Sequence, residues 1–426
     1  MEKSRDRRPV NIIKYGGEGL MASEQISICL MTTISGHELD FYRRKMKEFA
    51  VRHGVEINLH RVSWNKAFSW LIESFKNNNA PDVIQLGTTW VQAFARLGYL
   101  DIVPADIIRP VLADWMKNIC RLGGEWVAFP WFVEIRALLV WNDILNYLGN
   151  DCSQIGSSED FYRICQRLAD TKNSNIPPPF AFPIRPDAEI LHRFSCWHWA
   201  EGREFPSFSS MPEKILTLDS FQDTLKYVSR LIRSNAVSRS ELQKHSYRLY
   251  REFADKQYVF YQGNWETRVG EEYGHSLPEY NIIPLPVSDE GKHWGGGSVL
   301  AVSAMSGNRE ISWRLVKFIT RDEFINSWVK VNCNMMAFEC EFWDKFRSLP
   351  GVESGFELVK NSISYPAHPL WASVEKILSR GLSNYFWHIC TESSEPREED
   401  ISSCLIRTDR TFRKLLDLQW RGVHND

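Results

Sequence analysis

The first hundred residues alternate between patterns of apolar and polar positions that are typical of strands and of helices. Residues 25–33 (QISICLMTT) and 55–62 (VEINLHRV) are short, largely apolar runs that favour strands. Between them, residues 38–53 carry apolar side chains at helical spacing, and Gly54 follows as a stop signal. A strand, a helix and a strand in this order predict a βαβ unit within a parallel sheet.

The same alternation continues along the chain. Residues 64–76 are amphipathic, residues 82–86 (DVIQL) form another short apolar run, and a further helix is expected to begin at Trp90. The first third of the chain therefore predicts an open, doubly wound α/β lobe. Residues 128–141 follow as an extended segment that contains a proline.

The remaining residues mix the two patterns, and the chain is too long for one compact core. Helices are expected at 158–169, 218–234, 239–254 and 310–319, and strands at 257–262, 281–286 and 298–303. We predict an α/β fold of two lobes, each a mixed sheet flanked by helices, with a mobile polar tail at residues 1–24. The predicted lobes are 25–132 plus 285–330, and 133–284 plus 331–426.

Charge and aromatic content narrow the classes of function. Lys and Arg total 51 and Asp and Glu total 53, which argues against a nucleic-acid-binding protein with its concentrated basic face. No apolar run approaches the ~20 residues of a membrane-spanning helix. Most of the 17 tryptophans must belong to the core, but some could line a cleft, because aromatic faces pack on the apolar surfaces of sugar rings.

The nine cysteines are scattered and form no CxxC pair, so zinc clusters and thioredoxin-type redox motifs lack support. We expect no cofactor. Unpaired thiols favour a reducing compartment. Residues 1–25 have a basic start but no apolar signal segment. The chain as written is therefore expected to be cytoplasmic, unless its start is misassigned or trimmed.

Six segments stand in an informative order. They are APDVIQLGTTWVQAFARLGYLDIV (80–103), VAFPWFVEIRALLVW (127–141), CWHWAEGREF (196–205), GNWE (263–266), GGGSVLAVS (295–303) and SYPAHPLWASVEKIL (364–378). Together they resemble the extracellular solute-binding proteins of family 1, the maltose- and trehalose-type sugar receptors of ABC importers. The resemblance implies a type II periplasmic-binding-protein-like fold with a ligand cleft between the lobes. Asn264 and Arg203 depart from the family pattern, which has proline and glycine there.

The resemblance points to a first group of candidate ligand-binding residues at Thr89, Trp90, Trp131, Glu134 and Arg136. Thr89 and Trp90 follow a strand end, although a threonine there also suits helix capping. Trp131 either lines the cleft or packs the hinge. Glu134 and Arg136 lie on one face of an extended segment, where they form either a structural ion pair or a site that recognises sugar hydroxyls.

A second group of candidates comes from the later segments: Trp197, Trp199, Gly263, Trp265, Gly296, Gly297 and Ser298. The first two tryptophans share one face if their segment is extended, or else belong to the core. Trp265 is the best single candidate because it follows a strand end, where open α/β sheets bind ligands; a core position is the alternative. The glycine run lacks the ending of a phosphate loop and suits a turn that exposes backbone N–H groups to a ligand hydroxyl.

These observations predict a monomeric protein that captures a mono- or oligosaccharide by hinge closure and delivers it to an ABC permease. The alternative is a cytoplasmic sensor on the same fold that reports ligand occupancy to a regulator. An enzyme is disfavoured, because the sequence offers no Ser-His-Asp order, no defensible pair of catalytic carboxylates and no HExxH motif.

Overall fold

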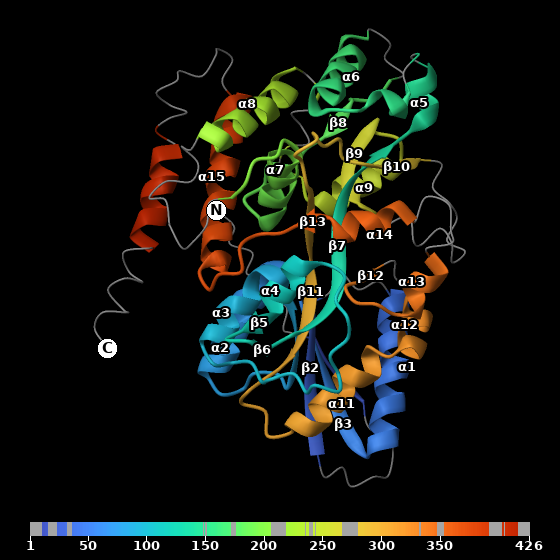
Figure 1. Ribbon diagram of the computed structural model, residues 1–426, viewed down its shortest axis with the longest axis vertical. Coiled ribbons are helices and arrows are strands. Elements are labelled where there is room, and N and C mark those ends of the chain that lie inside the picture. Colours follow the sequence, from blue (N-terminus) through green and yellow to red (C-terminus); the bar gives the residue numbers. More distant parts are fainter. Residues whose placement is uncertain are drawn as a thin grey trace, which may run out of the picture.

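The computed structural model describes residues 11–15, 24–31, 36–147, 149, 151–171, 176–205, 219–234, 236–237, 242, 244–265, 280–331, 334–346, 353–391, 403 and 405–415. In this part of the chain, helices and strands form two lobes, one above the other in Figure 1, with long strands running through the centre. The predicted two-lobed α/β fold is therefore confirmed.

Strands and helices alternate through both lobes. The strands are β1 (Asn11–Tyr15), β2 (Glu24–Met31), β3 (Val55–Val62), β4 (Val83–Gly87), β5 (Arg121–Leu122), β6 (Glu125–Trp126), β7 (Phe129–Val140), β8 (Phe180–Ala181), β9 (Phe260–Asn264), β10 (Asn281–Pro284), β11 (His293–Val302), β12 (Met335–Met336) and β13 (Ser362–Ile363). The helices are α1 (Gly36–His53), α2 (Trp64–Lys76), η1 (Thr88–Trp90), α3 (Val91–Arg96), α4 (Asp114–Cys120), α5 (Asn142–Tyr147), η2 (Cys152–Gln154), α6 (Ser158–Asp170), α7 (Ala188–Ala200), α8 (Asp219–Arg233), α9 (Ser246–Ala254), α11 (Arg309–Ile319), α12 (Asp322–Trp328), α13 (Glu341–Phe346), α14 (Glu353–Lys360) and α15 (Trp371–Thr391).

The first lobe is built on neighbouring strands in the order β1-β3-β2-β4. β2 runs parallel to both β3 and β4, as the βαβ pattern predicts, whereas β1 is antiparallel to β3. The limits of β3 and α2 are those predicted from the apolar pattern. In the view of Figure 1, α1 and α2 lie on opposite sides of these strands, where Phe49 and Leu71 are fully buried.

Strand β7 joins the lobes by changing neighbours along its length. Residues 129–135 pair with β11, and residues 136–140 pair with β9. β11 in turn pairs with β4 through residues 298–302. One sheet therefore continues from the first lobe into the second, and side chains on β7 and β11 lie where the lobes meet.

The second lobe is packed around α7, with α8 and α15 beside it. Residues 190–191 and 193–200 of α7 are all buried, so this helix has no solvent-facing polar stripe. Trp197 stacks on Phe161 of α6, and Phe194 stacks on Phe221 of α8. These contacts form a second apolar core, separate from the one around the first-lobe sheet.

Residues 11–15 differ from the sequence prediction. They were predicted to belong to a mobile polar tail, but they form strand β1, so that prediction is wrong for this stretch. Ile13 packs against the first core, and the open edge of β3 supplies hydrogen bonds to a short strand whatever its polarity. Apart from Glu24, the other residues of the predicted tail lie outside the described residues.

The residue limits of the two lobes stay a prediction. The predicted boundary at 132 falls inside β7, and residues 334–340 contact the first lobe although they were predicted to belong to the second. Phe338 forms a bridge with Val111, and the Ala337 N–H donates to the carbonyl of Trp131. No helix within the described ranges combines the length and apolarity needed to cross a membrane.

Candidate ligand-binding site

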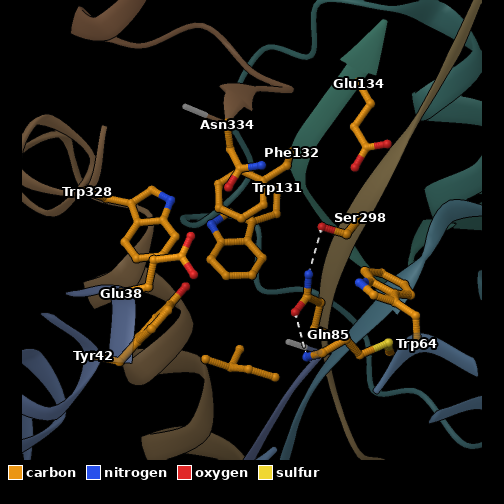
Figure 2. A pocket seen from close by; sticks show the side chains of 12 residues that line it. Glu38, Tyr42, Trp64, Gln85, Trp131, Phe132, Glu134, Ser298, Trp328 and Asn334 are labelled. Carbon is orange, nitrogen blue, oxygen red and sulfur yellow. Dashed lines mark hydrogen bonds between the residues drawn. The ribbon is translucent and has the colours of Figure 1, made fainter. Parts of the chain in front are cut away.

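A cavity of about 100 Å³ lies at the carboxyl ends of the first-lobe strands, against β7 and β11 (Figure 2). We call it the aromatic cavity. It is lined by Leu30, Met31, Glu38, Tyr42, Trp64, Gln85, Trp131, Phe132, Glu134, Ser298, Trp328 and Asn334. Open α/β sheets bind their ligands at this end of the strands, so the position itself marks a candidate binding site.

Five aromatic side chains line the cavity. The rings of Tyr42 and Trp328 are 4.7 Å apart, and Trp131 stacks on Phe132 at 3.9 Å. Figure 2 shows Trp64 on the opposite side of the cavity from Tyr42 and Trp328. Aromatic rings provide flat apolar faces for a ligand, and a few polar groups then fix the orientation of that ligand.

Gln85 is the most constrained of those polar groups. Its Nε2 donates to Ser298 Oγ at 3.1 Å, and its Oε1 accepts from the Met31 N–H at 2.9 Å (Figure 2). These bonds tie three neighbouring strands together at the cavity wall. Gln85 and Ser298 are both buried, so loss of either bond would leave a polar group without compensation.

Two carboxylates line the cavity. Glu38 lies in the first turn of α1, where a helix N-terminus favours a negative charge. Burial, together with the Glu38 carboxylate, raises the pKa of the Tyr42 hydroxyl. Burial also raises the pKa of Glu134, with Arg136 opposing this effect and the charge of Glu189 adding to it.

A group that we call the charged cluster, Arg136, Glu189, His192 and Arg193, adjoins Glu134 on the second-lobe side. Arg136 Nη2 donates to Glu189 Oε1 at 3.1 Å, and the Arg136 guanidinium lies 5.1 Å from the ring of Trp294. Arg193 is fully buried and donates to the Gln262 carbonyl and the Tyr261 hydroxyl. Burial opposes ionisation of Glu189, but Arg136, Arg193 and His192 outweigh it and lower its pKa to about 2. Two guanidinium groups thus share the single carboxylate of Glu189.

A third feature, which we call the interlobe contact, connects the lobes directly. Thr89 Oγ1, in the short helix η1 that follows β4, donates to Glu375 Oε2 of α15 at 3.2 Å. Trp90 also donates a hydrogen bond to Glu375, and its ring lies 5.6 Å from that of Trp64. The aromatic cavity is thus linked to the second lobe through two neighbouring tryptophans.

Glu375 also faces His192 of the charged cluster, with 3.5 Å between Oε1 and Nε2. The Tyr365 hydroxyl donates to Ser195, so it accepts from His192 Nδ1–H at 2.9 Å, which leaves Nε2 as an acceptor in the neutral ring. Burial lowers the pKa of His192 to about 4 and raises the pKa of Glu375 to about 7. When Glu375 is protonated and His192 is neutral, the carboxyl O–H can donate to Nε2, so both side chains have a hydrogen-bond partner.

Six of the predicted site residues lie in the aromatic cavity, the interlobe contact or the charged cluster. Trp131, Glu134 and Ser298 line the aromatic cavity. Thr89 and Trp90 form the interlobe contact, and Arg136 belongs to the charged cluster. Arg136 forms an ion pair with Glu189, and its charge also acts on Glu134, so the choice between a structural ion pair and hydroxyl recognition at Glu134 and Arg136 stays a prediction.

Trp197 and Trp199 lie elsewhere. An extended segment, one of the two interpretations of the sequence, is wrong, because these residues form the last part of helix α7. Trp197 packs on Phe161 and Tyr227, and Trp199 packs on Phe205 and Tyr365, so both belong to the second core. The helix is buried on all sides, which removed the polar positions that would have revealed its period.

The sequence predicts a turn at the glycine run, and that prediction is wrong, because these residues belong to strand β11. Gly296 pairs with Glu134 and Gly297 pairs with Val133 across the two strands. At Gly297, which has φ of +146°, a β-carbon would collide with the carbonyl of Phe132. The glycines therefore allow close approach of the two strands that connect the lobes.

Trp265 follows the end of strand β9, as predicted, and Gly263 lies within that strand, but both are packed against neighbours. A β-carbon at Gly263 would crowd Leu139. The side chain of Trp265 is 2% exposed, and its indole lies against Gly355 of α14. A ligand contact at these two positions stays a prediction.

Several cavity residues were missed by the sequence reasoning: Glu38, Tyr42, Trp64, Gln85, Phe132, Trp328 and Asn334. Gln85 carried a usable signal, because it is the one amide side chain in an otherwise apolar strand core. Trp64 comes shortly after the end of β3, and Glu38 lies in the first turn of the helix that follows β2; both positions are detectable. Trp328 and Asn334 carried none, since they reach the cavity only through the packing of α12 and β12 on the first lobe.

Metal binding finds no support in the described residues, where no group of three or more His, Cys, Asp or Glu side chains is placed to hold an ion. Buried thiols at Cys29, Cys120 and Cys165 are free, and burial raises the pKa of each.

Comparison with known proteins gives one family. Residues 45–332 match the family model of bacterial extracellular solute-binding proteins. The diacetylchitobiose-binding protein DasA of Streptomyces coelicolor is 21% identical over 389 residues, which cover 85% of this chain and 84% of that protein.

Two solved structures share the fold. One is maltose-bound MalE3 of T. maritima, with a TM-score of 0.77 and 17% identity, covering 92% of this chain and 100% of that one. The other is an ABC transporter solute-binding protein of Thermotoga lettingae bound with α-D-tagatose, with a TM-score of 0.77, 15% identity and the same coverage. At these identities the likeness establishes the architecture of two lobes and no more.

Proposed function

Because this chain belongs to the family of bacterial extracellular solute-binding proteins, we propose that it captures a carbohydrate between its lobes and delivers it to an ABC importer. The observation that carries the proposal is the aromatic cavity at the meeting of the lobes. Its rings suit the apolar faces of a sugar, and Gln85, Glu134 and Ser298 offer groups for hydroxyls. The similar proteins from Streptomyces coelicolor, T. maritima and Thermotoga lettingae carry diacetylchitobiose, maltose and tagatose in their names.

Capture then proceeds by hinge closure. The cavity of about 100 Å³ is small beside the ~300–1,000 Å³ of most ligand pockets, so a whole sugar enters only when the lobes separate. The hinge consists of β7 and β11, and opening breaks the hydrogen bond from Thr89 to Glu375. A ligand that contacts both lobes shifts the population toward the closed form by its differential affinity for that form.

The test is a thermal-shift screen of the purified chain against sugars, polyols, amino acids and metal ions. Binding to the native state raises the melting temperature as ligand concentration rises, by an amount that corresponds to about 2.7 kcal/mol at a hundredfold excess over Kd. We expect a concentration-dependent rise with one class of carbohydrate. A rise with amino acids or metal ions alone, or no rise with any compound at millimolar concentration, contradicts the proposal.

A second candidate is a cytoplasmic carbohydrate sensor on the same fold. The free, buried thiols of Cys29, Cys120 and Cys165 favour it, because unpaired cysteines are commoner in reducing compartments. Cell fractionation with an antibody against the chain distinguishes the sensor from the importer receptor. A protein outside the cytoplasmic membrane supports the importer role, and a protein confined to the cytoplasm supports the sensor.

A further inference from the structure

One wall of the aromatic cavity contains a buried hydrogen-bond donor that the protein itself does not use. The side chain of Trp328 is 3% exposed and lines the cavity, and its Nε1–H has no hydrogen-bond partner among the described residues. Other buried tryptophans find an acceptor within the protein: Trp141 and Trp343 donate to backbone carbonyls at 2.8 and 3.1 Å. A buried donor without an acceptor is costly, so the Trp328 N–H requires an acceptor from whatever occupies the cavity.

Neighbouring rings hold this donor in one orientation. The Trp328 ring lies 5.2 Å from the ring of Phe41 and 4.7 Å from that of Tyr42. It is nearly parallel to the ring of Phe132, at 6.4 Å. Figure 2 shows the indole nitrogen on the edge of Trp328 that faces Asn334, which also lines the cavity, and away from Tyr42. The donor is therefore preorganised toward space that a ligand can fill.

A second tryptophan shows what distinguishes this position. Trp197 is also buried, and its Nε1–H likewise has no hydrogen-bond partner among the described residues. Its ring packs on Phe161 and Tyr227 in the second core and does not line the aromatic cavity. The donor of Trp197 thus lies in a packed interior, whereas the donor of Trp328 adjoins a cavity. The two residues form a matched pair in which only one donor can reach a ligand.

We propose that Trp328 is a specificity-determining residue whose Nε1–H donates a hydrogen bond to an oxygen of the bound carbohydrate. This rests on the proposed function, because it names the group of the sugar that the cavity recognises. An indole N–H only donates, so it selects a hydroxyl or ring oxygen and offers nothing to an ammonium group. A site with a buried donor rejects an analogue that lacks the matching oxygen, because the donor is then unpaired in the complex.

The first measurement follows the indole N–H resonances of the full, isotope-labelled chain by NMR. The chain is titrated with maltose, diacetylchitobiose and D-tagatose, and with the carbohydrate that the thermal-shift screen identifies if none of these binds. The Trp328 resonance is assigned within the parent chain, so this measurement needs no variant. The new hydrogen bond should shift the Trp328 indole proton downfield and slow its exchange with water, while the Trp197 resonance changes little. If a sugar binds without either change at Trp328, the inference is overturned and carbohydrate capture stands.

The second measurement removes the donor by substitution. Trp328→Phe keeps an aromatic ring, and calorimetric titration should show that it binds the same sugar roughly threefold to tenfold more weakly, as expected for one neutral hydrogen bond. Trp328→Phe should also lose the discrimination between that sugar and the monodeoxy analogue that the parent chain rejects. Trp197→Phe, which removes the corresponding donor from the second core, should leave affinity and discrimination unchanged.

The outcomes separate this inference from the proposed function. If Trp328→Phe binds the sugar as tightly as the parent chain, or if both variants lose affinity equally, the inference is overturned and carbohydrate capture stands. If no carbohydrate binds the parent chain, the proposed function fails and this inference fails with it.

Discussion

The aromatic cavity and the charged cluster lie side by side, yet they treat polar groups in opposite ways. In the charged cluster, Arg136 and Arg193 both pair with the carboxylate of Glu189, and Arg193 also donates to Tyr261 and Gln262. In the aromatic cavity, Trp328 has a buried donor with no partner among the described residues, and two carboxylates face space that a ligand can fill. The comparison teaches that ion pairs within the protein hold one region together, whereas the other region arranges rings and a few polar groups around space that a ligand can fill.

The largest effect is expected in the charged cluster. Arg193→Met removes a fully buried cation, which leaves Glu189 with less compensation and frees the acceptors of Gln262 and Tyr261. Breaking a buried ion pair from one side costs about 3 kcal/mol or more of unfolding free energy. Denaturant titration of the variant and the parent chain measures this loss.

The matched control is Arg230→Met. Arg230 pairs with Glu159 on the surface, where both side chains are about half exposed. Exposed pairs of this kind contribute about 1 kcal/mol or less. Equal losses in the two variants would show that the charged cluster is no more important to the fold than a surface pair.

The next effect concerns the interlobe contact and depends on pH. The pKa of Glu375 is raised to about 7 in the folded chain, against ~4.3 for an unfolded glutamate, so the folded state binds the extra proton between these values. The free energy of unfolding that this proton contributes has its full value below about pH 4 and is lost as the pH rises through about 7. Glu375→Gln mimics the protonated acid and should therefore stabilise the chain at pH 8 by about 3 kcal/mol, but not at pH 4.

Unfolding free energies of Glu375→Gln and the parent chain across pH 4–8 give the test. The exposed Glu310→Gln serves as control and should show no such trend. A difference between Glu375→Gln and its parent that stays constant with pH would mean that Glu375 is ionised in the fold, and the neutral pairing with His192 would then be wrong.

The same contrast explains what the sequence could predict. The strand at 55–62 and the helix at 64–76 follow from local apolar periods, and the structure has them at those limits. Helix α7 hid its period because all its faces are buried. The cavity was only partly predictable: Trp131 and Glu134 lie in a recognisable segment, whereas Trp328 reaches it from two hundred residues away through tertiary packing, which no local pattern encodes.

Ser298→Ala sharpens the comparison within the cavity wall. The change removes the acceptor of Gln85 Nε2 and leaves a buried amide donor without compensation, at a cost of about 1–2 kcal/mol in unfolding free energy. Because Gln85 also holds the Met31 N–H, its reorientation should weaken ligand binding as well. Ser327→Ala, on the exposed side of α12, is the control and should alter stability and affinity little; equal effects of both changes would mean that the Gln85–Ser298 bond is unimportant.

The smallest effect on the fold, with a clear effect on binding, is expected for Trp64→Ala. Trp64 is 37% exposed and makes an edge-on contact with Trp90 at 5.6 Å, so its removal should cost about 1 kcal/mol of stability or less. It nevertheless forms one side of the aromatic cavity, and loss of its ring should reduce affinity for the carbohydrate found in the thermal-shift screen by about tenfold. Trp387→Ala, a similarly exposed tryptophan on α15 that does not line the cavity, should leave affinity unchanged. If both variants bind equally well, the ligand does not occupy this cavity, and the contrast between a binding part and a structural part would have to be drawn elsewhere in the cleft.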